Sequence, residues 1–208
     1  MDKVTPEQAK AFERCVSVGG VALFPADTVY GLATEPDSRE GVERLYALKG
    51  RPATRPAAVM FFSVELALAA LPELGARTRA AAQALLPGAL TLVLPNPARR
   101  FGPACVPEPE RLGLRVPDLP AQLAALHSVR RPVLQSSANR SGGADARRIG
   151  DVDAEIRRGV DLAIDGGELP GTPSTVVDLT GFEGAGDYRI LREGAVSATT
   201  LAASLNRL

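Results

Sequence analysis

The sequence predicts a mixed α/β or α+β fold in one domain that spans residues 1–208. Short apolar runs predict strands, and longer segments with apolar residues at helical spacing predict helices. These elements do not alternate strictly, which indicates a mixed sheet instead of a regular βαβ series. The 208 residues, 45% of them hydrophobic, are enough for one substantial core.

The first predicted elements are a capped helix and a short strand. Thr5, Pro6 and Gln8 supply the N-cap, a first-turn proline and the capping-box partner of a helix. This helix is expected to end near Val16. A strand is expected at residues 21–24, where four apolar residues follow a glycine pair.

Residues 26–32 are expected to form a loop that presents polar groups at the end of this strand. Asp37 and Glu40 have capping-box spacing and predict the start of a second helix. Its apolar stripe places Lys49 in the last turn, on the same face as the buried residues. Gly50 then ends the helix, because glycine readily adopts the left-handed conformation of a C-cap.

The rest of the chain continues as a mixture of strands and helices. Further strands are expected at residues 57–62, 90–94, 112–116, 133–136, 162–165, 175–179 and 188–191. Further helices are expected at residues 63–71 and 77–86, from Asp118 to about His127, from Asp151 to about Gly159, and after Ser197. Residues 95–109 are rich in proline and are expected to form a loop.

The composition excludes several classes of protein. The formal net charge is zero, which argues against a general affinity for nucleic acid. Cys15, Cys105 and the single histidine, His127, lack the spacing of a zinc site, so no metal site is predicted. Unpaired cysteines, no signal peptide and no apolar run of membrane-spanning length indicate a cytoplasmic location.

Lys49 stands out because Lys3 and Lys10 are the only other lysines in the chain. Arg51 follows two residues later, just past the predicted helix end. A lysine point charge beside a forked arginine suits a polyphosphate, for which this pair would form a clamp. Two cations that face the negative end of a helix dipole are the simpler interpretation, and this segment alone supports both equally.

Three other segments carry candidate ligand-binding groups. Thr28 offers a hydroxyl at the end of a strand. Ser137 and Asn139 follow an apolar strand, in a loop whose backbone N–H groups could hold phosphate or ribose oxygens. Arg115 lies within an apolar strand and would need a partner if buried, such as a substrate carboxylate. Each segment also fits a plain loop or strand, and neither a GxxxxGK[ST] loop nor a GxGxxG fingerprint is present.

Taken in order, these segments resemble the YrdC-like family and, within it, the short form of the threonylcarbamoyl-AMP synthases. The pattern Lys-x-Arg followed later by Ser-x-Asn is the hallmark of that family. The matching segments cover nearly the whole chain, at residues 25–32, 49–52, 87–92, 114–117, 137–142, 165–167, 173–178 and 191–194. Two positions depart from the family pattern: Ala26 stands where threonine is usual, and Met60 where longer members have histidine.

The resemblance implies a twisted, largely parallel sheet flanked by helices around a concave, positively lined cavity. It also implies a nucleotidyltransferase reaction in which L-threonine, bicarbonate or CO2, and ATP give threonylcarbamoyl-AMP and pyrophosphate, assisted by Mg²⁺. The product would feed the formation of threonylcarbamoyladenosine in tRNA through a separate transferase complex.

The resemblance also assigns residues to the substrates. The expected ATP-binding residues are Lys49, Arg51, Ser137, Asn139 and Arg192, and the expected threonine-binding residues are Thr28, Arg115 and Ser174. Lys49 and Arg51 are expected to be the catalytic cations, and Arg115 to bind the threonine carboxylate. Ser174 and Arg192 lie at predicted strand ends and are weak signals without the resemblance.

Two alternatives remain open at this point. A non-catalytic module that binds tRNA or double-stranded RNA would fit a concave basic surface, although aromatic residues make up only 4% of the chain and disfavour base stacking. A paralogue that acts on another carbamoyl substrate is the second alternative. Pyrophosphate release that depends on threonine and bicarbonate separates the enzyme from both.

Overall fold

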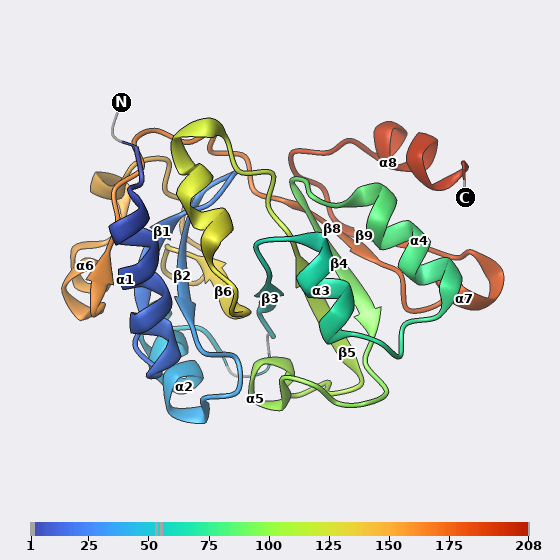
Figure 1. Ribbon diagram of the computed structural model, residues 1–208, viewed down its shortest axis with the longest axis horizontal. Helices are drawn as coiled ribbons and strands as arrows, with labels where there is room; N and C mark the ends of the chain where they lie inside the picture. Colours follow the sequence, from blue (N-terminus) through green and yellow to red (C-terminus); the bar gives the residue numbers. More distant parts are fainter. Residues whose placement is uncertain (1–2, 53, 55, 208) are drawn as a thin grey trace.

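The computed structural model describes residues 3–52, 54 and 56–207, and its strands form a single sheet (Figure 1). The nine strands of the described residues follow the order β7-β1-β2-β6-β3-β5-β4-β8-β9. Their bounds are β1 (Ala22–Pro25), β2 (Tyr30–Thr34), β3 (Ala58–Met60), β4 (Leu90–Pro95), β5 (Arg111–Arg115), β6 (Val133–Ser137), β7 (Leu162–Ala163), β8 (Thr175–Asp178) and β9 (Arg189–Arg192).

The mixed α/β sheet predicted from the sequence is confirmed. The parallel pairs are β1 with β7, β3 with β5 and β4 with β8. The other five pairings are antiparallel, so the parallel share is smaller than the resemblance implied. The reason is that β1 and β2, β4 and β5, and β8 and β9 are neighbours in both the chain and the sheet. A chain that returns beside the strand it has just left runs antiparallel.

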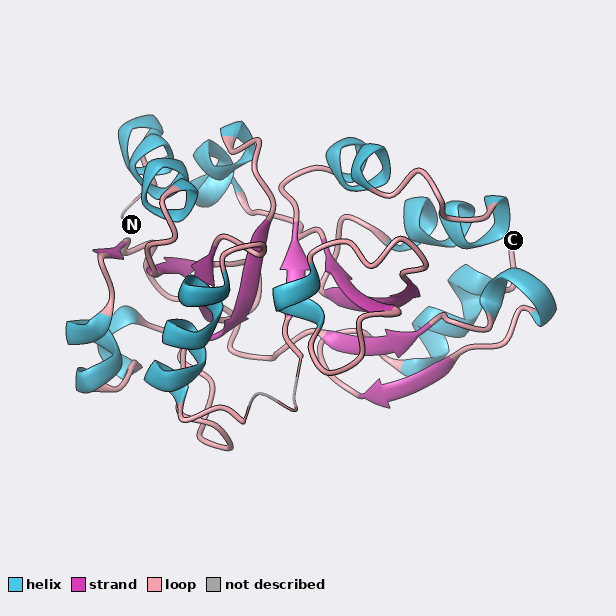
Figure 2. Ribbon diagram, turned by 90° about the horizontal axis from the view of Figure 1, so that it is seen from below, coloured by secondary structure: helices cyan, strands magenta, loops and turns pink. Residues whose placement is uncertain are grey.

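Helices cover the sheet from both sides. They are α1 (Pro6–Ser17), α2 (Arg39–Lys49), α3 (Val64–Ala70), α4 (Ala76–Leu85), α5 (Gly102–Cys105), α6 (Ala154–Gly159), α7 (Phe182–Ala185) and α8 (Ala198–Leu205), with the 3₁₀ segments η1 (Ala121–Ser128) and η2 (Ile149–Asp151). α1, η1, α3 and α4 lie on one side, and α2 and α6 lie on the other, near β1 and β2 (Figure 2). No helix in the described part of the chain has the length and apolar character needed to cross a membrane.

Two predicted helix caps are confirmed, at the start of α1 and at the end of α2, and a third is corrected. Thr5 forms the predicted capping box with Gln8 at the start of α1. α2 ends at Lys49, and Gly50 is its C-cap with a left-handed φ of 58°. The cap at the start of α2 is Ser38, whose side chain accepts from the Gly41 N–H, and not Asp37 as predicted. Serine caps as well as aspartate does, so adjacent candidates cannot be separated from sequence.

Three other sequence expectations are corrected by the structure. Residues 30–32, the last part of the loop expected at 26–32, belong to β2, whose five residues are all buried between β1 and β6 and show no polar alternation. The segment after Asp118 is the 3₁₀ helix η1, whose N-cap is Pro120. The N-cap of α6 is Asp153, two residues after the predicted Asp151.

The core joins the sheet to the helices on the α1 side. Phe12 of α1 packs against Phe24 of β1, with ring centroids 4.9 Å apart, and against Phe62, at 5.9 Å. Each fully buried side chain of this size contributes about 1.5–3 kcal/mol to stability relative to an exposed one. The sheet is thereby fixed from that side, which leaves the opposite face of its central strands available for a cavity.

Candidate active site in a cavity on the open face of the sheet

A cavity of about 310 Å³ lies on the face of the central strands opposite α3 and α4. Successive side chains of a strand point to opposite faces of the sheet. In β4, Thr91 and Val93 therefore line the cavity, while the intervening Leu92 is buried on the helix side. Ala58 and Gly113 are direct partners in β3 and β5 and also line it. These two small residues leave a hollow where larger side chains would fill the sheet surface.

Five of the eight predicted site residues line this one cavity: Arg51, Arg115, Ser137, Ser174 and Arg192. The other three, Thr28, Lys49 and Asn139, lie directly behind the wall and hydrogen-bond to lining residues or to their turn. The chain positions of these eight residues span 28 to 192, so the grouping is produced by the fold alone. The sequence analysis missed other lining residues, including Thr91, Arg111 and Gln135.

Lys49 is buried behind the cavity wall, with 2% of its surface exposed. Its ammonium donates to the Ser137 carbonyl, to the Asn139 carbonyl at 2.8 Å and to Asn139 Oδ1 at 3.1 Å. Burial, followed by repulsion from Arg51, lowers the pKa of Lys49 to about 8. The ammonium therefore ties the end of α2 to the turn formed by residues 137–139, using only neutral acceptors.

This turn, which we call the Ser137–Asn139 turn, is held by its own hydrogen bonds. The Ser137 hydroxyl donates to Asn139 Oδ1 at 2.7 Å, and Asn139 Nδ2 donates to the Gly143 carbonyl. The Ser141 N–H donates to the Lys49 carbonyl at 2.8 Å, which adds a backbone contact to the same helix end. The turn is thus positioned before any ligand arrives, which lowers the cost of ordering it on binding.

Arg51 is held at the cavity edge by contacts on two sides. Its Nη2 donates to the Pro56 carbonyl at 2.7 Å, and its guanidinium lies 5.7 Å from the centre of the Tyr46 ring. The Tyr46 hydroxyl in turn accepts from the Ala57 N–H at 3.0 Å. α2 therefore supplies both the lysine behind the cavity and the aromatic ring that supports the arginine beside it.

Arg115 is a buried cation with an incomplete set of partners. Its side chain is 4% exposed and forms an ion pair with Asp27, whose side chain is 5% exposed. The same nitrogen, Nη2, donates to the Thr28 hydroxyl at 2.6 Å, whereas the buried Nε has no partner among the described residues. Because an unpaired buried donor is costly, this arrangement indicates that a ligand completes the fork.

Arg192 reaches the cavity from the edge strand β9. Its Nη2 donates to the Ser174 carbonyl at 2.7 Å and to the Ser174 hydroxyl at 3.3 Å. That hydroxyl also shares a hydrogen bond of 2.9 Å with Thr91. Burial lowers the pKa of Arg192 from its ordinary value. No ion pair among the described residues involves Lys49 or Arg192.

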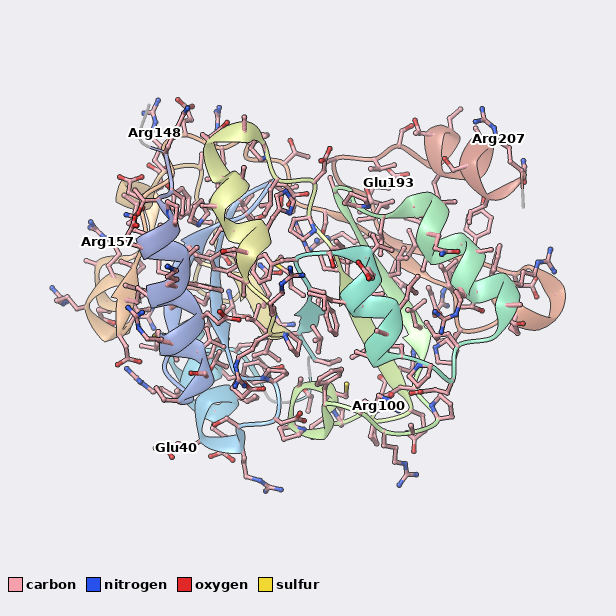
Figure 3. The ribbon with its side chains drawn as sticks, viewed as in Figure 1. Glu40, Arg100, Arg148, Arg157, Glu193 and Arg207 are labelled. Carbon is pink, nitrogen blue, oxygen red and sulfur yellow. The ribbon has the colours of Figure 1, made fainter. Side chains whose placement is uncertain are left out.

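A second, more open hollow of about 740 Å³, which we call the outer groove, lies between α1, the start of α2 and β7. Two of its four charged residues pair with each other: Arg44 binds both oxygens of Asp161, at 2.6 and 2.9 Å. Arg148 likewise pairs with Glu168, and it projects outward from the periphery, as Arg157 does (Figure 3). No cluster of three metal-binding His, Cys, Asp or Glu side chains occurs in the described ranges.

The fold and the cavity define an α/β protein with an arginine-lined hollow on the open face of its sheet. Residues 14–194 match the Sua5/YciO/YrdC family, which is described as telomere recombination, and the chain belongs to this family. The chain is 32% identical over 164 residues to the threonylcarbamoyl-AMP synthase of Pyrococcus abyssi and 31% identical over 162 residues to that of Bacillus subtilis. These alignments cover 78% and 76% of the chain.

The chain spans about half the length of these two curated relatives, 48% and 46%. It spans 87% of the threonylcarbamoyl-AMP synthase of Marinobacter nauticus, to which it is 29% identical over 79% of its own length. Among solved structures, Sua5 of P. abyssi in complex with L-threonine has a TM-score of 0.79 and 26% identity, covering 98% of this chain and 58% of that one. YciO of E. coli, at 23% identity and a TM-score of 0.77, shows the same fold and covers 96% and 95%.

Proposed function

We propose that this chain makes threonylcarbamoyl-AMP and pyrophosphate from L-threonine, bicarbonate or CO2, and ATP, and is thus a nucleotidyltransferase. The observation that carries the proposal is the meeting of Arg51, Arg115, Ser137, Ser174 and Arg192 at one cavity. Membership of the family and the names of the similar synthases support the same reaction.

The triphosphate is assigned to Arg51, Arg192 and the Ser137–Asn139 turn, which line the cavity or adjoin its wall. The two arginines offer N–H groups to phosphate oxygens, and the turn offers a hydroxyl and an amide to the nucleotide. Lys49 adds positive charge from behind the turn, where low exposure makes that charge more effective than it would be in water. A phosphate that contacts the ammonium directly must displace one of its three neutral acceptors.

Threonine is assigned to the side of the cavity that carries Arg115, Thr28 and Ser174. The buried Nε of Arg115 has no partner among the described residues and is assigned to the carboxylate, while Asp27 and Thr28 hold Nη2 of the same guanidinium. Thr28 and Ser174 supply hydroxyls beside it, each already fixed by an arginine. The complex of P. abyssi Sua5 with L-threonine, a protein of the same fold, supports an amino-acid site in this cavity.

Two bond-forming steps follow from these positions. The neutral threonine amine attacks bicarbonate, with loss of water, or CO2, with loss of an amine proton to solvent, and in both cases the N-carboxylate (carbamate) forms. A carbamate oxygen then attacks the α-phosphorus of ATP, and the bond to the bridging oxygen of pyrophosphate breaks in line. No side-chain nucleophile is needed. The chain contributes placement of the two substrates and cations where negative charge develops on the leaving pyrophosphate.

Mg²⁺ would arrive with the nucleotide as MgATP. Asp27 and Glu108 are engaged by Arg115 and Arg111, and Asp145, which interacts electrostatically with Lys49 and Arg192, belongs to no cluster of three metal-binding side chains among the described residues. We therefore assign no side chain of this protein as a magnesium ligand. A separate transferase that passes the product to tRNA is the partner that this activity requires.

Pyrophosphate release measured with purified protein tests the proposal. Release is expected only when ATP, threonine and bicarbonate are all present, and omission of either threonine or bicarbonate should return it to background. A signal that ignores threonine would point to another carbamoyl acceptor. Salt-dependent binding of RNA without any ATP-dependent release of pyrophosphate would instead favour a non-catalytic RNA-binding module.

A further inference from the structure

Gln135 is a buried amide that faces the cavity. It lies in β6, two residues before Ser137, and 5% of its surface is exposed. On one side its sheet partner is Ala58 of β3, which leaves open space towards the cavity floor. On the other side, a Cβ at Gly31 would lie 2.7 Å from Gln135 Nε2, so the glycine in β2 makes room for the amide.

The amide of Gln135 has no hydrogen-bond partner among the described residues, in contrast to the second buried amide, Asn96. Asn96 is 1% exposed, donates to the carbonyls of Arg100 and Pro109 at 2.9 and 2.8 Å, and accepts from the Arg100 N–H at 3.0 Å. Buried polar groups are nearly always paired, with protein, water or ligand. Asn96 is satisfied by its own loop, whereas Gln135 lines a cavity and is available to a ligand.

The sheet register places Gln135 between Ser137 and Arg115, which are proposed to bind different substrates. Gln135, Ala58 and Gly113 form one row across β6, β3 and β5. Ser137 lies two residues further along β6, about 6.6 Å from Gln135 at the rise of a strand. Arg115 lies on the other side of this row from Ser137. It pairs with Met60 of β3, and Met60 pairs with Val133, which precedes Gln135 in β6. The Gln135 row thus lies between the Ser137–Asn139 turn and Arg115, whereas Arg192 lies on the Arg115 side, because Thr91 and Val176 connect the two arginines across the sheet.

We infer that Gln135 binds the one-carbon carboxylate that joins the two substrates, as bicarbonate before the reaction and as the threonine N-carboxylate after it. Both are planar anions with acceptor oxygens, and the Nε2 N–H groups of a glutamine are matching neutral donors. The inference rests on the proposed function, because that reaction puts this group between the threonine carboxylate and the α-phosphate. Gln135 has the role of holding the carbamate oxygen for attack, without itself transferring a proton.

The test uses Gln135→Met, which keeps side-chain length but has no donor, and Gln135→Glu, which replaces the donor with an anion. In both, the KM for bicarbonate in pyrophosphate release should rise about 10–100-fold, the range for a lost hydrogen bond to a charged group, and more in the glutamate variant. The KM for ATP and the affinity for threonine without bicarbonate should stay within about twofold, because other residues make the contacts proposed for those two substrates. Gln83→Met, the same change at an exposed position of α4, serves as control.

A binding measurement separates this inference from the proposed function. The ¹³C line of labelled bicarbonate, observed with threonine and a non-hydrolysable ATP analogue, should broaden on addition of the unmodified protein but not of Gln135→Met. Equal broadening by both proteins, or an unchanged KM for bicarbonate in the variant, would overturn the role of Gln135 while leaving the reaction standing. If the line broadens with the unmodified protein but not with Gln135→Met, and the unmodified protein releases no pyrophosphate, the proposed reaction is rejected and the role of Gln135 in binding bicarbonate stands. No broadening by the unmodified protein would reject both.

Discussion

The central cavity and the outer groove both contain arginine, but they differ in what neutralises it. In the outer groove, Arg44 is paired through two nitrogens with the two oxygens of Asp161. In the central cavity, the hydrogen bonds among the described residues join Arg192 to oxygens of Ser174 and Lys49 to oxygens of the Ser137–Asn139 turn, and neither cation has an ion pair among those residues. The groove is the larger of the two, at about 740 against 310 Å³. The partners of these three cations therefore distinguish the two hollows better than volume does, although Arg111, which also lines the cavity, is paired with Glu108 and Asp178.

Arg115 is an intermediate case that sharpens this contrast. It is ion-paired like Arg44, yet it is almost fully buried, and its Nε lacks a partner among the described residues. In an exposed salt bridge, water can pair with any donor that the partner leaves free. A buried cation with an unpaired donor instead keeps an unfavourable desolvation free energy, which a ligand that accepts a hydrogen bond can remove. The comparison thus predicts strong effects at Arg115 and Lys49 and a weak one at Arg44.

The largest effect is expected for Arg115→Ala. Loss of the fork should raise the KM for threonine by an amount equivalent to about 2–5 kcal/mol, because the anionic partners Asp27 and the substrate carboxylate are left unpaired. The KM for ATP should change little. Steady-state pyrophosphate release at varied threonine measures the effect, with a melting curve to show that the variant is folded. An unchanged affinity for threonine would reject the carboxylate role.

Lys49→Ala should lower turnover by about 10²–10³-fold, the usual result of removing one group that stabilises charge in a transition state. The change also leaves the carbonyls of Ser137 and Asn139 without their buried donor, so the turn loses its connection to α2. Turnover near that of the unmodified protein would count against a role in triphosphate chemistry.

The third-largest effect is expected in the pH dependence of ATP affinity. Because the pKa of Lys49 is about 8, its ammonium loses its proton above pH 8, and ATP affinity should then fall by up to about tenfold per pH unit. The contribution of Lys49 to the free energy of unfolding changes in the opposite direction. The unfolded state retains the proton up to its higher pKa, so this contribution becomes more favourable between pH 8 and about 10.5.

Titration of ATP at pH 7.5, 8.5 and 9.5 by calorimetry checks this prediction, with Lys49→Met as the variant that cannot titrate. The methionine protein should bind ATP more weakly at low pH but with a nearly flat profile. An identical slope in the two proteins would assign the pH effect to another group.

The smallest effect is expected for Arg44→Ala in the outer groove. The Arg44 and Asp161 side chains are each 42% exposed, and exposed ion pairs contribute only about 0–1 kcal/mol to stability. Pyrophosphate release should match that of the unmodified protein within about twofold, and thermal unfolding should shift by a few degrees at most. A loss of activity as large as that of Lys49→Ala would show that charge pairing does not distinguish the two hollows.

The parts of the fold that local chemistry determines could be predicted from the sequence. The capping box at Thr5 and the C-cap at Gly50 are correct because each depends on residues within one turn of helix. β2 could not be predicted, since its five residues are all buried and include a glycine, and burial on both faces removes the alternation that identifies a strand. The choice between Asp37 and Ser38 as the cap depends on backbone angles that both residues accept equally well.

The candidate site was predictable in part, through the resemblance and not through spacing. The motif positions at residues 49, 51, 115, 137, 174 and 192 do meet around one cavity wall. The sequence predicted Lys49 on the buried face of its helix, but not its contacts behind that wall, because the acceptors Ser137 and Asn139 lie 88 and 90 residues further along the chain. Gln135 was missed because its importance lies in having no partner, which only the tertiary structure reveals. Its two-residue spacing from Ser137 in a strand was the one available signal.

The hollow over β3 and β5 exists because Ala58 and Gly113 contribute almost no side chain there. A rigid sheet therefore sets the depth of the site, and the surrounding loops do not have to move to change it. Enlarging either residue would make the pocket shallower from beneath while the arginines at its rim stay where they are. Variants at these two positions should thus select substrates by size, offering a simple way to redesign which amino acid the protein accepts.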